Sequence, residues 1–167
     1  MVTNLTSEPK NEVITLLRAR LTDYNSSSRS PTSSQWILPF FPRLNLVKNS
    51  YPRISVTEVS ETAEIINVNR DMMYHPRLQI DVWVWAGIDG KDSMLLIINS
   101  VVHEGGKLLD LIARDVRNVL DTNKSDFDDD TNKLHNYRLL ASVDMGADPD
   151  KPQVIRKRID VEYDYFR

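Results

Sequence analysis

The sequence of 167 residues contains no cysteine. Zinc ribbons, thiol catalysis, iron–sulfur clusters and disulfide frameworks all need that side chain, so each of them is excluded. A single domain of this length buries about 70% of the surface that its unfolded chain exposes, so it can fold without a disulfide or a metal. We therefore expect one domain that spans residues 1–167.

Long apolar runs and an excess of positive charge are also missing. The longest apolar run, Met94 to Ile98, is far too short to cross a bilayer. The stretch from Met1 to Lys10 is polar and lacks the apolar segment of a signal peptide. The net charge of −3 argues against duplex DNA binding as the main role, because phosphate neutralisation needs a strongly basic surface. We expect a protein that neither enters a membrane nor holds DNA, although DNA can pass close to it.

Motifs for catalysis or cofactor binding are missing as well. Gly105 and Gly106 lack the spacing of a dinucleotide fingerprint, and there is no phosphate loop with its lysine. His75, His103 and His135 are about thirty residues apart and fit no metal-ligand spacing. There is no Gly-x-Ser-x-Gly elbow for a serine nucleophile. The expectation is a protein that is not an enzyme and that binds no cofactor and no metal.

Apolar periodicity, in contrast, is clear and predicts both helices and strands. Apolar residues at three- and four-residue spacing predict a helix over Ser7 to Tyr24 and another over Lys107 to Asp121. The stretch Met94 to Val102 suits a helix or a buried strand, and we favour the helix. Alternation predicts strands at 53–59, 77–86, 134–145 and 154–166, with a further pairing segment at 64–68. Strand pairs joined by short turns favour an antiparallel or mixed sheet packed against helices, which is an α+β fold.

Three segments between these elements have a different character. Residues 25–35 are rich in serine and predict a flexible loop. Residues 36–47 are apolar but contain Pro39 and Pro42, so we expect an extended stretch held against the core. Residues 123–133 predict an acidic loop.

Trp83 and Trp85 are the most informative side chains. They share one face of the predicted strand Arg77 to Ala86, whose other face is apolar at Leu78, Ile80, Val82, Val84 and Ala86. Two interpretations stay open: the tryptophans pack in the core under a helix, or they contact a neighbouring subunit, where aromatic side chains are enriched.

The residues just before this strand pose the same choice. Met72, Met73 and Tyr74 fall in an expected loop, where large apolar side chains have no core to join. There the subunit-interface interpretation is the stronger one.

An acidic run at Asp126, Asp128, Asp129 and Asp130 superficially resembles the start of a calcium loop. A hand-type loop needs a glycine at its sixth position and a glutamate at its twelfth, but Thr131 and Tyr137 stand there. The simplest interpretation is a solvated loop. The alternative is that several copies line a pore, where carboxylates would keep DNA phosphates from binding.

The whole arrangement resembles the tail-terminator (tail-completion) proteins of long-tailed bacteriophages and archaeal tailed viruses. The resemblance is one of order and spacing and has no single diagnostic motif. The segments that carry it are the amphipathic first helix, Phe41-Pro42, Tyr51 to Val56, Leu78 to Ala86, Leu108 to Arg117 and Arg158 to Tyr163.

This resemblance implies a structural protein of the virion that forms a hexameric ring at the head-proximal end of the tail. Such a ring ends the tail tube and joins it to the neck, so the implied partners are further copies of the chain, the tail tube protein and a neck or head-completion protein. It assembles in the host cytoplasm, and DNA passes through it without specific binding. The alternatives are a neck or head-completion subunit, a small α+β ligand- or peptide-binding module, and an enzyme without recognisable motifs.

Overall fold

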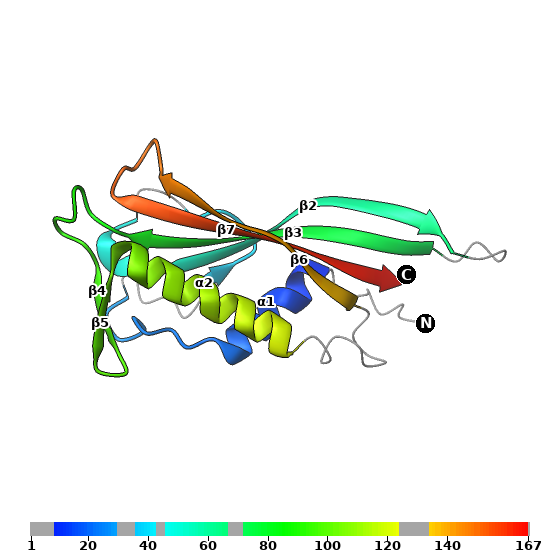
Figure 1. Ribbon diagram of the computed structural model, residues 1–167, viewed down its shortest axis with the longest axis horizontal. Coiled ribbons are helices and arrows are strands. Elements are labelled where there is room, and N and C mark those ends of the chain that lie inside the picture. The colour runs from blue at the N-terminus through cyan, green and yellow to red at the C-terminus, as the bar shows by residue number, and fades with distance from the viewer. Residues whose placement is uncertain (1–8, 30–35, 43–45, 67–71, 124–133, 167) are drawn as a thin grey trace.

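The computed structural model describes residues 9–29, 36–42, 46–66, 72–123 and 134–166 (Figure 1). The elements in chain order are α1 (Pro9–Arg20), β1 (Ile37–Leu38), the short 3-10 helix η1 (Lys48–Ser50), β2 (Arg53–Ile65), β3 (Met72–Trp85), β4 (Leu95–Ile98), β5 (Val101–Glu104), α2 (Gly105–Thr122), β6 (Leu134–Ala147) and β7 (Val154–Phe166). None of the described helices is long and apolar enough to cross a membrane.

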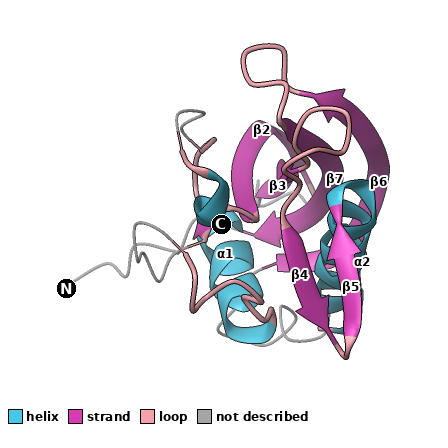
Figure 2. Cartoon of the chain, turned by 90° about the vertical axis from the view of Figure 1, so that its left-hand side faces the viewer, coloured by secondary structure: helices cyan, strands magenta, loops and turns pink. Residues whose placement is uncertain are grey.

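The main sheet is five-stranded, in the order β1-β2-β3-β7-β6. Only the pair β1–β2 is parallel, and the pairs β2–β3, β3–β7 and β7–β6 are antiparallel. Strands β4 and β5 form a separate two-stranded ribbon. The sheet curves around the two helices (Figure 2). The α+β class, with a mixed sheet packed against helices, is thus confirmed.

The core lies between one face of the main sheet and the helices. Val56, Ile80 and Ile159 form a row across β2, β3 and β7, and all three are fully buried. Helix α2 covers this row with an apolar stripe that includes Leu108, Leu109, Ile112, Val116 and Leu120. The predicted apolar face of β3 and the predicted stripe of α2 are both confirmed. We refer to this side of the sheet as the helix face and to the other side as the open face.

Helix α1 is shorter than the sequence suggests. The predicted start at Ser7 lies outside the described residues, the first described helical residue is Pro9, and the helix ends at Arg20 rather than at Tyr24. The Asp23 side chain accepts hydrogen bonds from the Asn25 N–H and from Arg29, and such local bonds compete with helical pairing.

The start of the serine-rich loop is anchored. The Asn25 amide donates to the backbone oxygens of Asn49 and Tyr51, and Arg29 donates to those of Ser50 and Pro52. Both side chains are buried, so the flexibility expected for 25–35 does not extend to these two residues, and positions 30–35 lie outside the described residues.

The segment Met94 to Val102 is a hairpin, so the favoured helix was wrong. Leu96 and Ile98 point into the core, whereas Leu95 and Ile97 are exposed, which is the period of a strand. Asn99 and Ser100 have φ values of 52° and 64°, which suits the two-residue turn of a tight hairpin.

The hairpin formed by β2 and β3 is longer than predicted. Met72, Met73 and Tyr74 are strand residues of β3 rather than loop residues. They pair in that order with Ile65, Glu64 and Ala63 on β2. The expected pairing of 64–68 is confirmed for Glu64 and Ile65, while 67 and 68 lie outside the described residues.

The position of Ile80 gives a test of the core. Ile80→Ala removes a fully buried side chain between two paired strands, so it should lower the free energy of unfolding by roughly 2–5 kcal/mol through lost burial and the cavity left behind. Urea unfolding of the purified protein measures this. The same deletion at an exposed position, Ile88→Ala, should change stability by no more than about 0.5 kcal/mol. Equal effects at the two positions would contradict the assigned core.

Candidate functional site

The distal part of the β2–β3 hairpin projects beyond the helices at one end of the molecule (Figure 1). We call this part, residues 58–65 and 72–77, the arm. Ala63 pairs with Tyr74 and Ile65 with Met72, so these four side chains lie on the helix face of the arm. Ile65 is 62% exposed, and Met72 and Tyr74 are half-buried. The arm therefore offers an apolar surface that the described helices do not cover.

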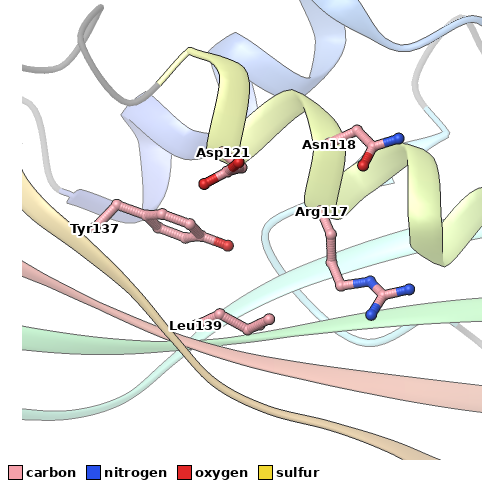
Figure 3. A pocket seen from close by; sticks show the side chains of 5 residues that line it. All are labelled: Arg117, Asn118, Asp121, Tyr137 and Leu139. Carbon is pink, nitrogen blue, oxygen red and sulfur yellow. The ribbon is translucent and has the colours of Figure 1, made fainter.

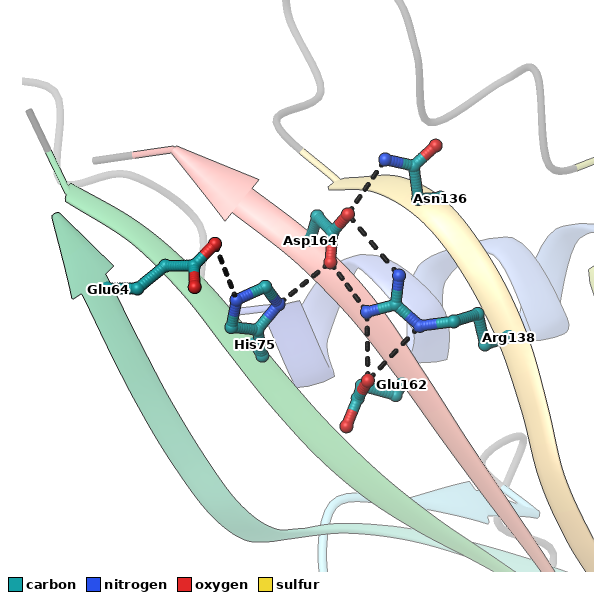
Figure 4. Close-up of polar contacts among 6 residues, drawn as sticks. All are labelled: Glu64, His75, Asn136, Arg138, Glu162 and Asp164. Carbon is teal, nitrogen blue, oxygen red and sulfur yellow. Dashed lines mark hydrogen bonds and ion pairs between the residues drawn. The ribbon is translucent and has the colours of Figure 1, made fainter. Parts of the chain in front are cut away.

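The open face of the arm is held by a polar network centred on Asp164 (Figure 4). The Asp164 carboxylate lies 2.8 Å from His75 Nδ1 and accepts hydrogen bonds from Asn136 at 2.7 Å and from Arg138 at 2.6 Å. Arg138 also donates to Glu162 at 2.8 Å. This network joins β3, β7 and β6 where the hairpin leaves the body of the protein, and so it fixes the direction of the arm.

The hydrogen bonds of this network join charged groups, and they shift the pKa values of those groups. Burial alone would raise the pKa of Asp164, but hydrogen bonds from Arg138, Asn136 and His75 outweigh it and hold that pKa below its usual range. The bond to Asp164 in turn raises the pKa of Arg138. The carboxylates of the last strand thus form structural ion pairs.

The β4–β5 ribbon lies at the other end of the long axis (Figures 1 and 2). Leu96 and Ile98 face the core, while Leu95, Ile97 and Val102 form an apolar outer face. Ile97 is 74% exposed. A patch of large exposed aliphatic side chains on a hydrogen-bonded ribbon is typical of a protein-binding surface.

The two tryptophans belong to the body of the protein. Trp83 is 3% exposed, its Nε1–H donates to Ser55 Oγ, and Arg156 stacks on its ring at 4.9 Å. Its aromatic neighbour is Phe41, from the extended segment, rather than a helix. Trp85 is half-buried and donates to the Asp92 oxygen. Of the two interpretations, the structure supports the core for Trp83.

The predicted interface residues do not form one cluster. Met72, Met73 and Tyr74 lie at the arm end of β3, and Trp83 and Trp85 lie at its other end. The acidic residues Asp126, Asp128, Asp129 and Asp130 lie outside the described residues.

Asp81 is a buried carboxylate on the open face that the sequence did not single out. It is completely buried, and burial raises its pKa despite a hydrogen bond from Gln79 and two nearby arginines. Arg156 and Arg158 lie 3.8 and 3.7 Å from Asp81 Oδ1. Because the Asp81 side chain is fully buried and lies beside two arginines, we interpret it as a structural charge. The described residues contain no group of side chains that could hold a metal ion.

A shallow pocket of about 340 Å³ lies between α2 and β6 (Figure 3). Its lining residues are Arg117, Asn118, Asp121, Tyr137 and Leu139. Burial, assisted by the negative charge of Asp121, raises the pKa of Tyr137 to about 12, so its hydroxyl stays protonated at neutral pH. Arg117 Nε is buried and has no hydrogen-bond partner among the described residues.

No protein-family model and no curated protein matches the sequence. The resemblance to tail terminators therefore rests on the order and spacing of the elements.

The Asp164 network gives a prediction with a defined pH dependence. Because the folded-state pKa of Asp164 is lowered, its contribution to stability is present above the unfolded-state pKa of about 3.9 and is lost as the pH falls through the folded-state pKa. Asp164→Asn should therefore cost about 2 kcal/mol at pH 7, from the loss of charge-assisted hydrogen bonds, and much less near pH 3. Urea unfolding at both pH values measures the difference. A cost that does not change with pH, or an equal cost for the exposed control Asp150→Asn, would contradict this role.

Proposed function

We propose that this protein is a structural subunit that assembles with copies of itself into a ring of the tail-terminator type. The observation that carries the proposal is the presence of two unlike apolar surfaces, the outer face of the β4–β5 ribbon and the helix face of the arm, at opposite ends of the molecule. A surface of this kind on a folded domain usually has a protein partner.

Two unlike patches on one chain favour head-to-tail assembly. A two-fold dimer buries the same patch on both subunits, whereas a contact between different patches leaves one free patch on each subunit and continues. Such a series closes into a ring when the rotation between subunits allows it. The resemblance to tail terminators gives the ring six subunits.

In this role the ring sits in the virion at the head-proximal end of the tail, between the tail tube protein and a neck or head-completion protein. It needs no catalysis and no cofactor. DNA passes through the lumen, and the net charge of −3 suits a wall that does not retain phosphate. Asp126, Asp128, Asp129 and Asp130 are candidates for that wall.

The pocket beside Tyr137 is the observation that favours the alternative of a ligand-binding module. It is lined by few side chains and is open to solvent, whereas a typical small-molecule site encloses most of its ligand. A neck or head-completion subunit shares the size and the partners of a terminator, and it differs in which stacked protein it binds.

Aspartate substitutions in the two apolar surfaces test the proposal. The unmodified protein should form rings at micromolar concentrations, and Ile97→Asp and Ile65→Asp should each prevent them, because an interface that buries a lone carboxylate is strongly disfavoured. Native mass spectrometry gives the number of subunits, and circular dichroism verifies that each variant is folded.

The matched control is Val47→Asp, which places the same charge on an exposed aliphatic residue outside both surfaces. It should leave the rings intact. A protein that stays monomeric at all concentrations, and that also fails to bind the end of a purified tail tube, would contradict the proposed function.

A further inference from the structure

Both edges of the main sheet are open in the described part of the chain. Strand β6 is the last strand on one side. On the other side, β1 pairs only with Ile54 and Ser55, so the rest of β2, from Thr57 to Ile65, has no described neighbour on its outer edge. Unpaired strand edges bind further strands readily, because their N–H and C=O groups are already aligned.

The directions of the strands make these two edges compatible. Every neighbouring pair from β2 through β3 and β7 to β6 is antiparallel, so β2 and β6 run in opposite directions. A second copy that continues the sheet beyond β6 therefore presents its β2 antiparallel to β6. Neighbouring strands then remain antiparallel across the contact, and the helix face of one copy continues into the helix face of the next.

Charge complements this geometry. The outer part of β2, residues 57–66, carries Glu58, Glu61 and Glu64 and no basic residue. Glu61 is exposed and pairs with Pro76, which places it on the helix face. On that same face, beside β6, lies the pocket lined by Arg117, a half-buried arginine whose buried Nε has no hydrogen-bond partner among the described residues. Asp121, the acidic residue of the pocket, already has a partner of its own.

Exposed apolar side chains accompany the charges on both edges. Val59 and Ile65 are exposed on β2, and Leu139, Leu140 and Val143 are exposed on β6. Each edge is therefore incomplete in two respects, since it has backbone groups without a described strand partner and uncovered aliphatic side chains. The β2 edge is acidic, whereas β6 carries one arginine and one aspartate and so has no net charge.

We propose that the outer edge of β2 in one copy pairs with β6 of the next copy and places Glu61 in the pocket of Arg117. This contact rests on the proposed function, because it specifies how neighbouring subunits of the ring join.

Cross-linking tests the contact directly, because the chain has no cysteine of its own. Two variants, Glu61→Cys and Arg117→Cys, are mixed in equal amounts and treated with a short bismaleimide. A head-to-tail contact between β2 and β6 should give cross-linked dimers in the mixture and none with either variant alone. The chain that carries both substitutions should give a ladder of products that ends at the size of the ring.

A charge exchange tests the ion pair. Glu61→Arg and Arg117→Glu should each weaken assembly by about tenfold or more, and the chain with both substitutions should recover most of the loss. Asp150→Arg, which changes the net charge as Glu61→Arg does but lies in the turn beyond the end of β6, outside the paired residues, should have no effect.

The outcomes separate this inference from the proposed function. Rings that form normally but give no mixed cross-link, or cross-links of Glu61→Cys to itself, would overturn the β2–β6 contact and leave the ring in place. An unmodified protein that forms no rings at any concentration, and that also fails to bind the end of a purified tail tube, would overturn both.

Discussion

Strand β3 is the constraint on which the rest of the structure depends. It is hydrogen-bonded on both edges, to β2 and to β7, over nearly all of Met72 to Trp85. One half lies in the body of the protein, where Ile80, Val82 and Trp83 are buried on the two faces of the sheet. The other half continues past the helices, and the same ladder that builds the core therefore also builds the arm. A change that unfolds the core would therefore also disrupt the arm, because both depend on the same strand.

Two carboxylates on the open face show how environment decides the effect of a buried charge. Asp164 accepts three well-formed hydrogen bonds, which lower its pKa despite burial, so its charge stabilises the fold. Asp81 is more deeply buried, and in the described part of the chain its Oδ1 has no hydrogen-bond partner although two arginines lie within 4 Å. Burial raises its pKa, so its charge costs free energy. We interpret Asp81 as a residue that holds Arg156 and Arg158 in place on β7.

The sequence predicts the elements whose burial follows one simple period. Alternation gives the buried face of β3, and three- and four-residue spacing gives α2, because each of these elements has only one face against the core. The hairpin at 94–102 was missed because five consecutive apolar residues hide a period of two, and its turn at Asn99 and Ser100 contains no glycine.

The candidate surfaces were harder to predict than the core. Met72 to Tyr74 were recognised as unusual for a loop, and their apolar character does reach the surface, but in a strand. The free edges depend on which strand lies beside which, and the insertion of β7 between β3 and β6 cannot be read from local periodicity. The Asp164 network joins residues as far apart as His75 and Asp164, and no spacing rule connects them.

The free edges link the fold to the proposed assembly. Natural sheets usually protect an edge with charges, proline or a covering segment, because an open edge promotes aggregation. Here the glutamates of β2 provide such protection, but β6 exposes Leu139, Leu140 and Val143 and contains no proline. An acidic edge repels another copy of itself and accepts a neutral or basic one, so the charges on β2 oppose edge pairing between two arms and permit pairing with β6. A closed ring built in this way has no open edge left, as in a β-barrel. In the proposed ring, the open edges that drive association are also the edges whose pairing ends it at a defined size.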